Sequence, residues 1–220
     1  RLTAQPTCSP GESVGRAYVV HGPVQTVASA CASATLAMGN ALAALRAGEI
    51  DIALAGGSDS LCRLTYAGFN SLRAVDPRAC RPFRTEREGM SIGEGAAVLV
   101  LETAASARAR GARILGWLLG AGASCDAHHM TAPDPQGAGI ARAVEAAFAD
   151  SGLQASDIDF VNVHGTGTPH NDAAEAKMLR AVFGDRLPRL PLTSSKGAIG
   201  HYLGAAGAIE AFVCVKVIAT

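Results

Sequence analysis

A cysteine framed by small residues is the first candidate for chemistry in this sequence. Cys31 lies in the run VASACASA, between an apolar stretch over 24–27 and a helical pattern that ends at Gly48. Small neighbours leave the sulfur accessible, and unpaired amide N–H groups at a helix N-terminus are expected to lower the thiol pKa. Cys31 is therefore a candidate nucleophile. A buried cysteine on an alanine-rich helix is the alternative, and the commoner case for a cysteine taken alone.

Two glycine-rich motifs in the second half each place a histidine after an apolar strand pattern. VHGTGTP contains His164, Thr166 and Thr168, and SSKGAIGH contains Lys196 and His201. Sites of α/β folds lie at such strand ends, where glycines allow close approach of a ligand and threonine hydroxyls can bind it. A structural histidine or a surface lysine is the ordinary alternative. One cysteine and two histidines at three such turns predict a Cys-His-His site.

The lysine of the second motif precedes an almost uncharged helical pattern over 204–219. An unpaired ammonium in an apolar region is costly, so Lys196 requires a partner. Glu210 is the only acidic residue of that segment. The sequence therefore predicts a pair between Lys196 and Glu210.

Composition excludes several classes of function. The 19 lysines and arginines balance 19 acidic residues, so nothing favours nucleic acid or an anionic membrane as a partner. The six cysteines show no CxxC pair or zinc-finger spacing, and no apolar run reaches membrane-spanning length. Without a charged-then-apolar leader, we expect a soluble, reduced, cytoplasmic protein that lacks a structural metal. The start in mid-pattern, without Met, indicates a fragment.

Alternating strand and helix patterns predict an α/β fold with a mostly parallel sheet covered on both faces. Strands are expected over 24–27, 50–55, 96–101, 114–121, 157–163 and 190–193. Helices are expected over 31–48, 104–110, 137–151, 173–183 and 204–219, the last one buried. Residues 58–83 are expected to be irregular. Because the pattern starts again from Arg113, we divide the chain just before that point into the halves 1–110 and 111–220.

Taken together, the motifs resemble the β-ketoacyl-acyl-carrier-protein synthases, the condensing enzymes of fatty-acid and polyketide synthesis. The matching pieces, in the family's order and spacing, are VASACASA, AGGSDS, RPF with REGMSIGEGAAVLVLE, SCDAHHMTAP, VHGTGTP with DAAEA, and SSKGAIGHYLGAAGA. The resemblance implies a thiolase-like, layered α-β-α-β-α fold of two similar halves, here incomplete at both ends. The family's longer chains include a Gly-Phe-Gly-Gly loop that supplies an oxyanion-hole N–H.

The resemblance also implies roles for individual residues. It assigns the nucleophile to Cys31, the catalytic histidines to His164 and His201, their support to Lys196 and Glu210, and binding of the phosphopantetheine arm to Thr166 and Thr168. The cysteine would accept an acyl chain, and the histidines would stabilise the enolate formed when a malonyl thioester loses CO2. The carbanion would then attack the acyl-cysteine. No metal or organic cofactor is implied, since the substrates are carried on phosphopantetheine.

Partners follow from the same resemblance. It implies an acidic acyl carrier protein and a dimer, either a homodimer or a heterodimer with a related subunit. The arginine-rich region 73–87 is a hypothesis for the carrier's docking surface, with Arg73 nearest to the family's docking arginine; a solvated loop is the alternative. Arg84 stands where the family usually has Asp. His128 and His129 are expected to be loop residues without a chemical role.

Fewer residues indicate which sub-class of the synthases this chain resembles. VASACASA and HNDAAE resemble free-standing, type II synthases. A thiolase-type acyltransferase acting on coenzyme A esters is the alternative enzyme, although HGTGT and KGAIGH favour a synthase. A non-catalytic binding or dimerisation subunit, or an inactive fragment, is the alternative outside enzymes. The presence of Cys31 argues against the chain-length-factor type of subunit, which lacks this cysteine.

Overall fold

The computed structural model describes residues 8–219, so the start of the chain in mid-pattern lies outside it. The helices are α1 (Ser9–Ala17), α2 (Ser33–Arg46), α3 (Arg63–Ser71), α4 (Ala104–Ala109), α5 (Ala138–Ser151), α6 (Pro169–Phe183), α7 (Lys196–Ile199) and α8 (Ala206–Ile218). The strands are β1 (Ile52–Asp59), β2 (Gly95–Glu102), β3 (Val161–Asn162) and β4 (Leu192–Thr193). Short 3-10 helices are η1 (Ala30–Ala32), η2 (Ala155–Asp157), η3 (Gly184–Arg189) and η4 (Leu203–Ala205).

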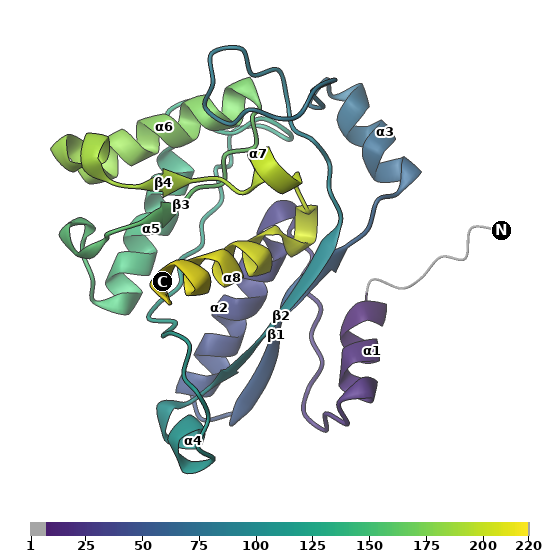
Figure 1. The fold of residues 1–220 in the computed structure, drawn as a ribbon, viewed down its shortest axis with the longest axis vertical. Coiled ribbons are helices and arrows are strands. Elements are labelled where there is room, and N and C mark those ends of the chain that lie inside the picture. The colour runs from purple at the N-terminus through teal and green to yellow at the C-terminus, as the bar shows by residue number, and fades with distance from the viewer. Residues whose placement is uncertain (1–7, 220) are drawn as a thin grey trace.

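One part of the molecule is built on the pair β1–β2, against which α2 and α8 lie side by side (Figure 1). The two strands are antiparallel, from Ile52 opposite Glu102 to Asp59 opposite Gly95. A Cβ on Gly57 would lie 2.6 Å from the carbonyl oxygen of Gly204. The small residue therefore lets β1 approach the turn that precedes α8. In this way the last helix of the chain packs on a sheet made by its first half.

The other part is built on β3 and β4, which pair in parallel and are covered by α5 and α6 (Figure 1). Its core consists of the buried residues Val163, Met178, Leu179, Phe183 and Leu190. Glycines with left-handed backbones flank α5, at Gly137 (φ 69°) and Gly152 (φ 72°), and α6 begins at Pro169. The start of α6 lies close to the end of β3, because Glu175 of α6 accepts the N–H groups of His164 and Gly165.

The expected single, mostly parallel sheet is wrong for the described residues, which form two separate two-stranded sheets. Residues 24–27 and 114–121 form no strand. In the second segment, side chains replace a neighbouring strand: Asp150 accepts the N–H of Ala121 at 2.8 Å, and Arg46 donates to the carbonyl of Leu119 at 2.6 Å. Neither stretch belongs to a sheet, so apolar runs alone did not identify pairing partners.

Two helices also differ from expectation. The helix α3 lies within the segment 58–83, which was expected to be irregular. In α8 only the first turn is buried, whereas Phe212 and Ile218 are 52% and 70% exposed. The expected helices at α2, α4, α5 and α6 and the strands β1 and β2 are present within a few residues of their predicted bounds. The division into 1–110 and 111–220 stays a prediction.

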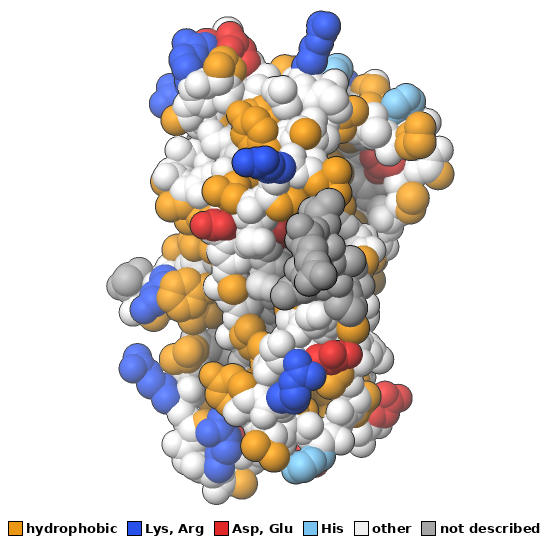
Figure 2. Space-filling view, turned by 90° about the vertical axis from the view of Figure 1, so that its right-hand side faces the viewer, with side chains coloured by type: hydrophobic (Ala, Val, Ile, Leu, Met, Phe, Trp, Pro, Cys, Tyr) orange, Lys and Arg blue, Asp and Glu red, His pale blue; other side chains and the backbone are white. Residues whose placement is uncertain are grey.

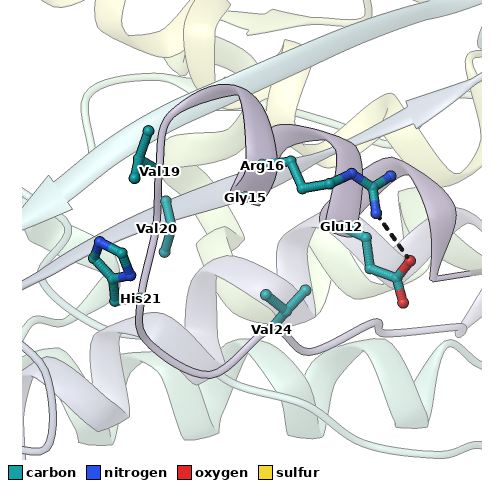
Figure 3. Close-up of a pocket in the computed structure, with 7 residues that line it drawn as sticks. All are labelled: Glu12, Gly15, Arg16, Val19, Val20, His21 and Val24. Atoms are coloured by element: carbon teal, nitrogen blue, oxygen red, sulfur yellow. Dashed lines mark ion pairs between the residues drawn. The ribbon is translucent and has the colours of Figure 1, made fainter.

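Hydrophobic side chains gather in several patches on the face shown in Figure 2. The exposed large apolar residues include Ile52, Leu54, Val98 and Val100 of the β1–β2 sheet. A surface hollow between α1 and the following loop is lined by valines and by the Glu12–Arg16 ion pair (Figure 3). It contains none of the candidate catalytic residues. Within residues 8–219, no helix combines the length and the apolar character needed to cross a membrane.

The contact at Gly57 gives a test of the fold. Gly57→Ala should destabilise the protein by about 1–3 kcal/mol, because the new methyl group meets backbone atoms of the turn before α8. Gly68→Ala in α3 is the matched control, since nothing lies within 4 Å of a Cβ there; it should be neutral or stabilising by up to about 1 kcal/mol. Urea unfolding measures both, and equal effects would contradict the packing described.

Candidate active site

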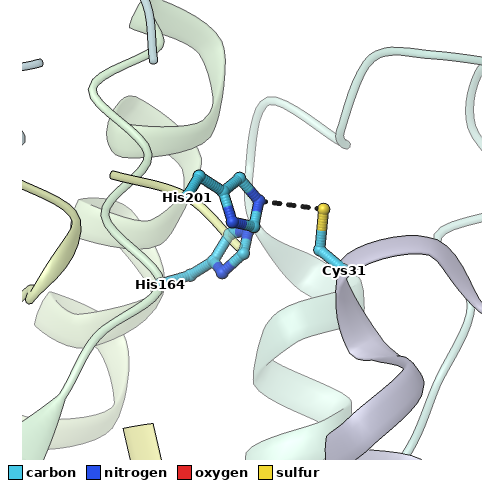
Figure 4. Close-up of side chains that lie close together, drawn as sticks. All are labelled: Cys31, His164 and His201. Atoms are coloured by element: carbon cyan, nitrogen blue, oxygen red, sulfur yellow. Dashed lines mark hydrogen bonds between the residues drawn. The ribbon is translucent and has the colours of Figure 1, made fainter. Parts of the chain in front are cut away.

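The predicted cysteine and histidines come together from three distant segments (Figure 4). Cys31 lies in η1 immediately before α2, His164 follows β3, and His201 lies between α7 and η4. The thiol sulfur and one ring nitrogen of each histidine all lie within 4.8 Å of one another. The Cys-His-His cluster expected from the sequence is therefore present in the structure.

Hydrogen bonds determine which nitrogen of His201 carries its proton. The N–H of Leu203 donates to Nδ1 of His201 at 3.2 Å, so Nδ1 must present a lone pair. The proton of the neutral ring therefore lies on Nε2, which is 2.9 Å from Sγ of Cys31. His201, which is fully buried, donates a hydrogen bond to the sulfur.

The backbone on both sides of His201 is held by neighbouring elements. Its N–H donates to the carbonyl of Ser91 at 2.7 Å, and its carbonyl accepts the N–H of Gly93 at 2.9 Å. Further along the turn, Asp59 at the end of β1 accepts the N–H of Gly204 at 3.0 Å. The position of the imidazole is thus set by the segment that leads into β2 and by β1.

Two backbone N–H groups beside His164 are bound by one carboxylate of α6. Glu175 accepts the N–H of His164 at 2.6 Å and that of Gly165 at 2.8 Å, and burial raises the pKa of this carboxyl. The His164 ring meets the His201 ring edge to face, with centroids 5.2 Å apart. Glu175 was not among the predicted site residues, although its place in DAAEA, eleven residues after the histidine, was a visible signal.

Both histidines are held neutral by their surroundings. Burial, and secondarily the ammonium of Lys196, lower the pKa of His164 to about 3. Burial lowers the pKa of His201 to about 2, with smaller contributions from His164 and Lys196. At neutral pH both rings are uncharged hydrogen-bonding groups.

The expected lowering of the Cys31 pKa is wrong. Burial raises the pKa of this half-buried thiol, and this effect outweighs the opposing effects of Lys196 and the backbone. The carboxylates of Glu210 and Asp59 add to the increase. Because desolvation disfavours the thiolate more than the helix start favours it, the resting group is a thiol.

The predicted pair between Lys196 and Glu210 is present. Lys196 is 1% exposed, and its ammonium forms an ion pair with the Glu210 carboxylate. Burial raises the pKa of Glu210, and the ammonium opposes that increase. The carbonyl of Lys196 also accepts a hydrogen bond from the buried thiol of Cys80 at 2.9 Å.

The remaining candidates have different surroundings. The hydroxyls of Thr166 and Thr168 are hydrogen-bonded to each other at 2.8 Å beside His164. Arg73 is exposed in the loop after α3. His128 and His129 are exposed, and Nδ1 of His129 accepts two backbone N–H groups of its own turn, so it has a structural role there.

A thiol and two imidazoles are also a donor set for zinc. In His201, however, Nε2 carries the proton and Nδ1 already accepts the N–H of Leu203. Neither nitrogen therefore offers a free lone pair to a metal ion. The arrangement fits a site that donates hydrogen bonds to a substrate.

Comparison with known proteins agrees with this geometry. Residues 12–107 match the family model "Beta-ketoacyl synthase, N-terminal domain", and residues 115–220 match "Beta-ketoacyl synthase, C-terminal domain". The chain therefore belongs to the β-ketoacyl synthase family. Neither match is to a thiolase, which was the alternative enzyme.

Individual relatives support the same assignment. Nodulation protein E of Rhizobium meliloti is 43% identical over 200 residues, covering 90% of this chain and 49% of that protein. The 3-oxoacyl-[acyl-carrier-protein] synthase 2 of Staphylococcus aureus is 40% identical over 196 residues, covering 86% of this chain and 49% of that protein. The structure of the ishigamide ketosynthase/chain length factor superposes with a TM-score of 0.90 at 40% identity, covering 96% of this chain and 51% of that chain. The predicted ketosynthase fold is confirmed, and the chain spans about half the length of these relatives.

The raised pKa of Cys31 can be tested against another cysteine of the same chain. Hydrogen bonds from the hydroxyl and backbone of Thr65 lower the pKa of the exposed Cys62. Iodoacetamide should therefore label Cys62 faster than Cys31 at pH 7, because alkylation follows the thiolate fraction. As pH rises, the labelling rate of each cysteine should increase about tenfold per pH unit until it levels off above that thiol's pKa. The Cys31 rate should level off at a higher pH than the Cys62 rate. Mass spectrometry of tryptic peptides resolves the two; a Cys31 rate that levels off first would contradict the account.

The ion pair gives a second test. Lys196→Met should destabilise the protein by about 3–5 kcal/mol, because it leaves Glu210 partly buried without its cation. The double variant Lys196→Met/Glu210→Leu should recover a large part of that loss, since both charges are then removed. Urea unfolding of the two single variants and the double variant gives the coupling. A double variant no more stable than Lys196→Met would show that the pair is not formed.

Proposed function

We propose that the protein is a β-ketoacyl-acyl-carrier-protein synthase, which condenses an acyl group with a malonyl thioester and releases CO2. One observation carries the proposal. The thiol of Cys31 accepts a hydrogen bond from Nε2–H of His201, and a second neutral imidazole, that of His164, lies beside it. A nucleophile next to two uncharged donors suits a reaction that forms a thioester and then an enolate.

The first half-reaction forms an acyl-enzyme. Sγ of Cys31 attacks the carbonyl carbon of an acyl thioester, the carbon–sulfur bond to the carrier's thiol breaks, and the Cys31 proton leaves with that thiol. Because burial keeps Cys31 protonated at rest, the proton is lost during attack and not before it. The Nε2–H of His201 stabilises negative charge that develops on the sulfur.

The second half-reaction forms the carbon–carbon bond. The malonyl thioester loses CO2, and the electron pair of the broken bond becomes an enolate whose oxygen accepts hydrogen bonds from His164 and His201. The carbanion carbon attacks the acyl carbonyl on Cys31, the carbon–sulfur bond to Cys31 breaks, and the cysteine thiolate takes a proton from solvent. Uncharged donors suit this step because they stabilise the enolate oxygen without giving it a proton.

The acyl and malonyl groups would enter on the phosphopantetheine arm of an acyl carrier protein, with Thr166 and Thr168 beside the arm. The name of the Staphylococcus aureus relative, which includes the carrier protein, supports this partner. A homodimer, or a heterodimer with a related subunit, is proposed by analogy with the ketosynthase/chain length factor structure. The proposal requires no resident metal or organic cofactor.

Separate assays of the two half-reactions test the proposal. Incubation with an acyl-carrier thioester should add one acyl group at Cys31, seen by mass spectrometry, and Cys31→Ala should abolish the adduct. Replacing both histidines, His164→Ala/His201→Ala, should lower malonyl decarboxylation by at least about 10²-fold, because two donors to the enolate oxygen are lost.

Cys62→Ala is the matched control, since this cysteine lies outside the cluster and its removal should change neither half-reaction. Acylation of another cysteine in place of Cys31 would overturn the proposal. Unchanged decarboxylation in the double histidine variant would refute the assigned role of the imidazoles.

A further inference from the structure

A loop rich in arginine packs directly on the turn that carries His164. We call residues 76–90 the arginine loop. The N–H of Phe83 donates to the buried carboxylate of Asp172 at 2.7 Å, and the same carboxylate accepts the N–H of Gly167 at 3.2 Å. A Cβ on Gly165 would lie 3.0 Å from the Phe83 ring, so ring and turn are in contact. The arginine loop therefore packs against the turn that carries Thr166 and Thr168.

Most cations of this loop are already paired. Carboxylates hold three of its four arginines: Arg78 by Asp76 and Glu88, Arg81 by Asp76, and Arg87 by Asp172. The fourth, Arg84, is exposed and forms no ion pair with any residue between positions 8 and 219. Its guanidinium is therefore available to an anion from outside the chain.

The backbone holds Arg84 in a fixed place. Its N–H donates to the carbonyl of Arg81 at 3.1 Å, and its own carbonyl accepts the Arg87 guanidinium at 2.8 Å. The preceding residue, Phe83, has a left-handed backbone (φ 61°) and is 39% exposed. Arg84 thus directly follows the residue whose ring contacts the turn, on a backbone held by hydrogen bonds, and fixed groups lose less conformational entropy when they bind.

The chemistry of the two side chains matches the outer end of a phosphopantetheine arm. From its thiol, the arm consists of two amide units, a carbon with two methyl groups, and a phosphate. We propose that Phe83 contacts the methyl groups and that Arg84 binds the phosphate. This assignment rests on the proposed function at Cys31. An arginine binds phosphate with several N–H groups at once.

The test compares acyl donors with and without the phosphate. Cys31 is acylated with a short acyl thioester of 4′-phosphopantetheine and, separately, with the same thioester of pantetheine. Arg84→Gln should lower the apparent second-order acylation rate with the phosphorylated donor about three- to tenfold at low salt and leave the other rate unchanged. Arg84→Asp should lower it further, and added salt should reduce the difference between wild type and variant.

Two further variants complete the experiment. Arg180→Gln removes another exposed arginine, in the last turn of α6, and should change neither rate. Phe83→Leu should slow acylation by both donors, because both carry the methyl groups, while the rate of iodoacetamide labelling at Cys31 stays unchanged if the turn is intact. A change in that labelling rate would assign Phe83 to positioning of the turn and overturn its proposed contact with the arm.

The other outcomes separate the two proposals. Equal loss with both donors in Arg84→Gln would overturn phosphate binding. A loss seen only with intact carrier protein, and not with free phosphopantetheine, would assign Arg84 to acidic residues of the carrier and equally overturn it. If the wild-type protein were acylated at Cys31 by neither donor nor by acyl-carrier protein, the proposed function itself would fail.

Discussion

The hydrogen bond from the N–H of Leu203 to Nδ1 of His201 is the constraint on which the site depends. It requires a turn in which Gly200 (φ 82°) and Leu203 (φ 50°) both adopt left-handed backbones, an unfavourable conformation for a leucine. Asp59 and the segment leading into β2 hold that turn in place. With its proton fixed on Nε2, His201 donates to Cys31 and cannot accept the thiol proton in this tautomer.

One buried positive charge sets the electrostatics around this bond. Lys196 is paired with Glu210, and both are contributed by the segment that also carries His201. The ammonium reinforces burial in keeping the histidines neutral, and it only partly offsets the desolvation of the thiol. The site consequently contains an uncharged thiol and uncharged imidazoles. Hydrogen bonds in such a buried setting are stronger than in water, which suits stabilisation of charge that appears only during reaction.

The sequence was most informative where residue types are chemically unusual. Cys31, His164 and His201 could be grouped because each follows a strand-like run or opens a helix, and Glu210 could be paired with Lys196 because it is the only nearby acid. The Cys31 pKa could not be predicted, since it depends on how much protein covers the sulfur. The stretches 24–27 and 114–121 have strand-like composition, but pairing requires a neighbour, and Arg46 and Asp150 occupy backbone groups of the second stretch.

Nuclear magnetic resonance of protein labelled with ¹⁵N-histidine can establish directly which nitrogen of His201 carries the proton. The six histidines can be assigned by single substitutions, and the nitrogen shifts report which ring nitrogen carries the proton. We expect His201 to be a neutral Nε2–H tautomer that does not titrate between about pH 8 and pH 4, since burial lowers its pKa to about 2. A proton on Nδ1, or conversion to imidazolium near pH 6, would contradict it.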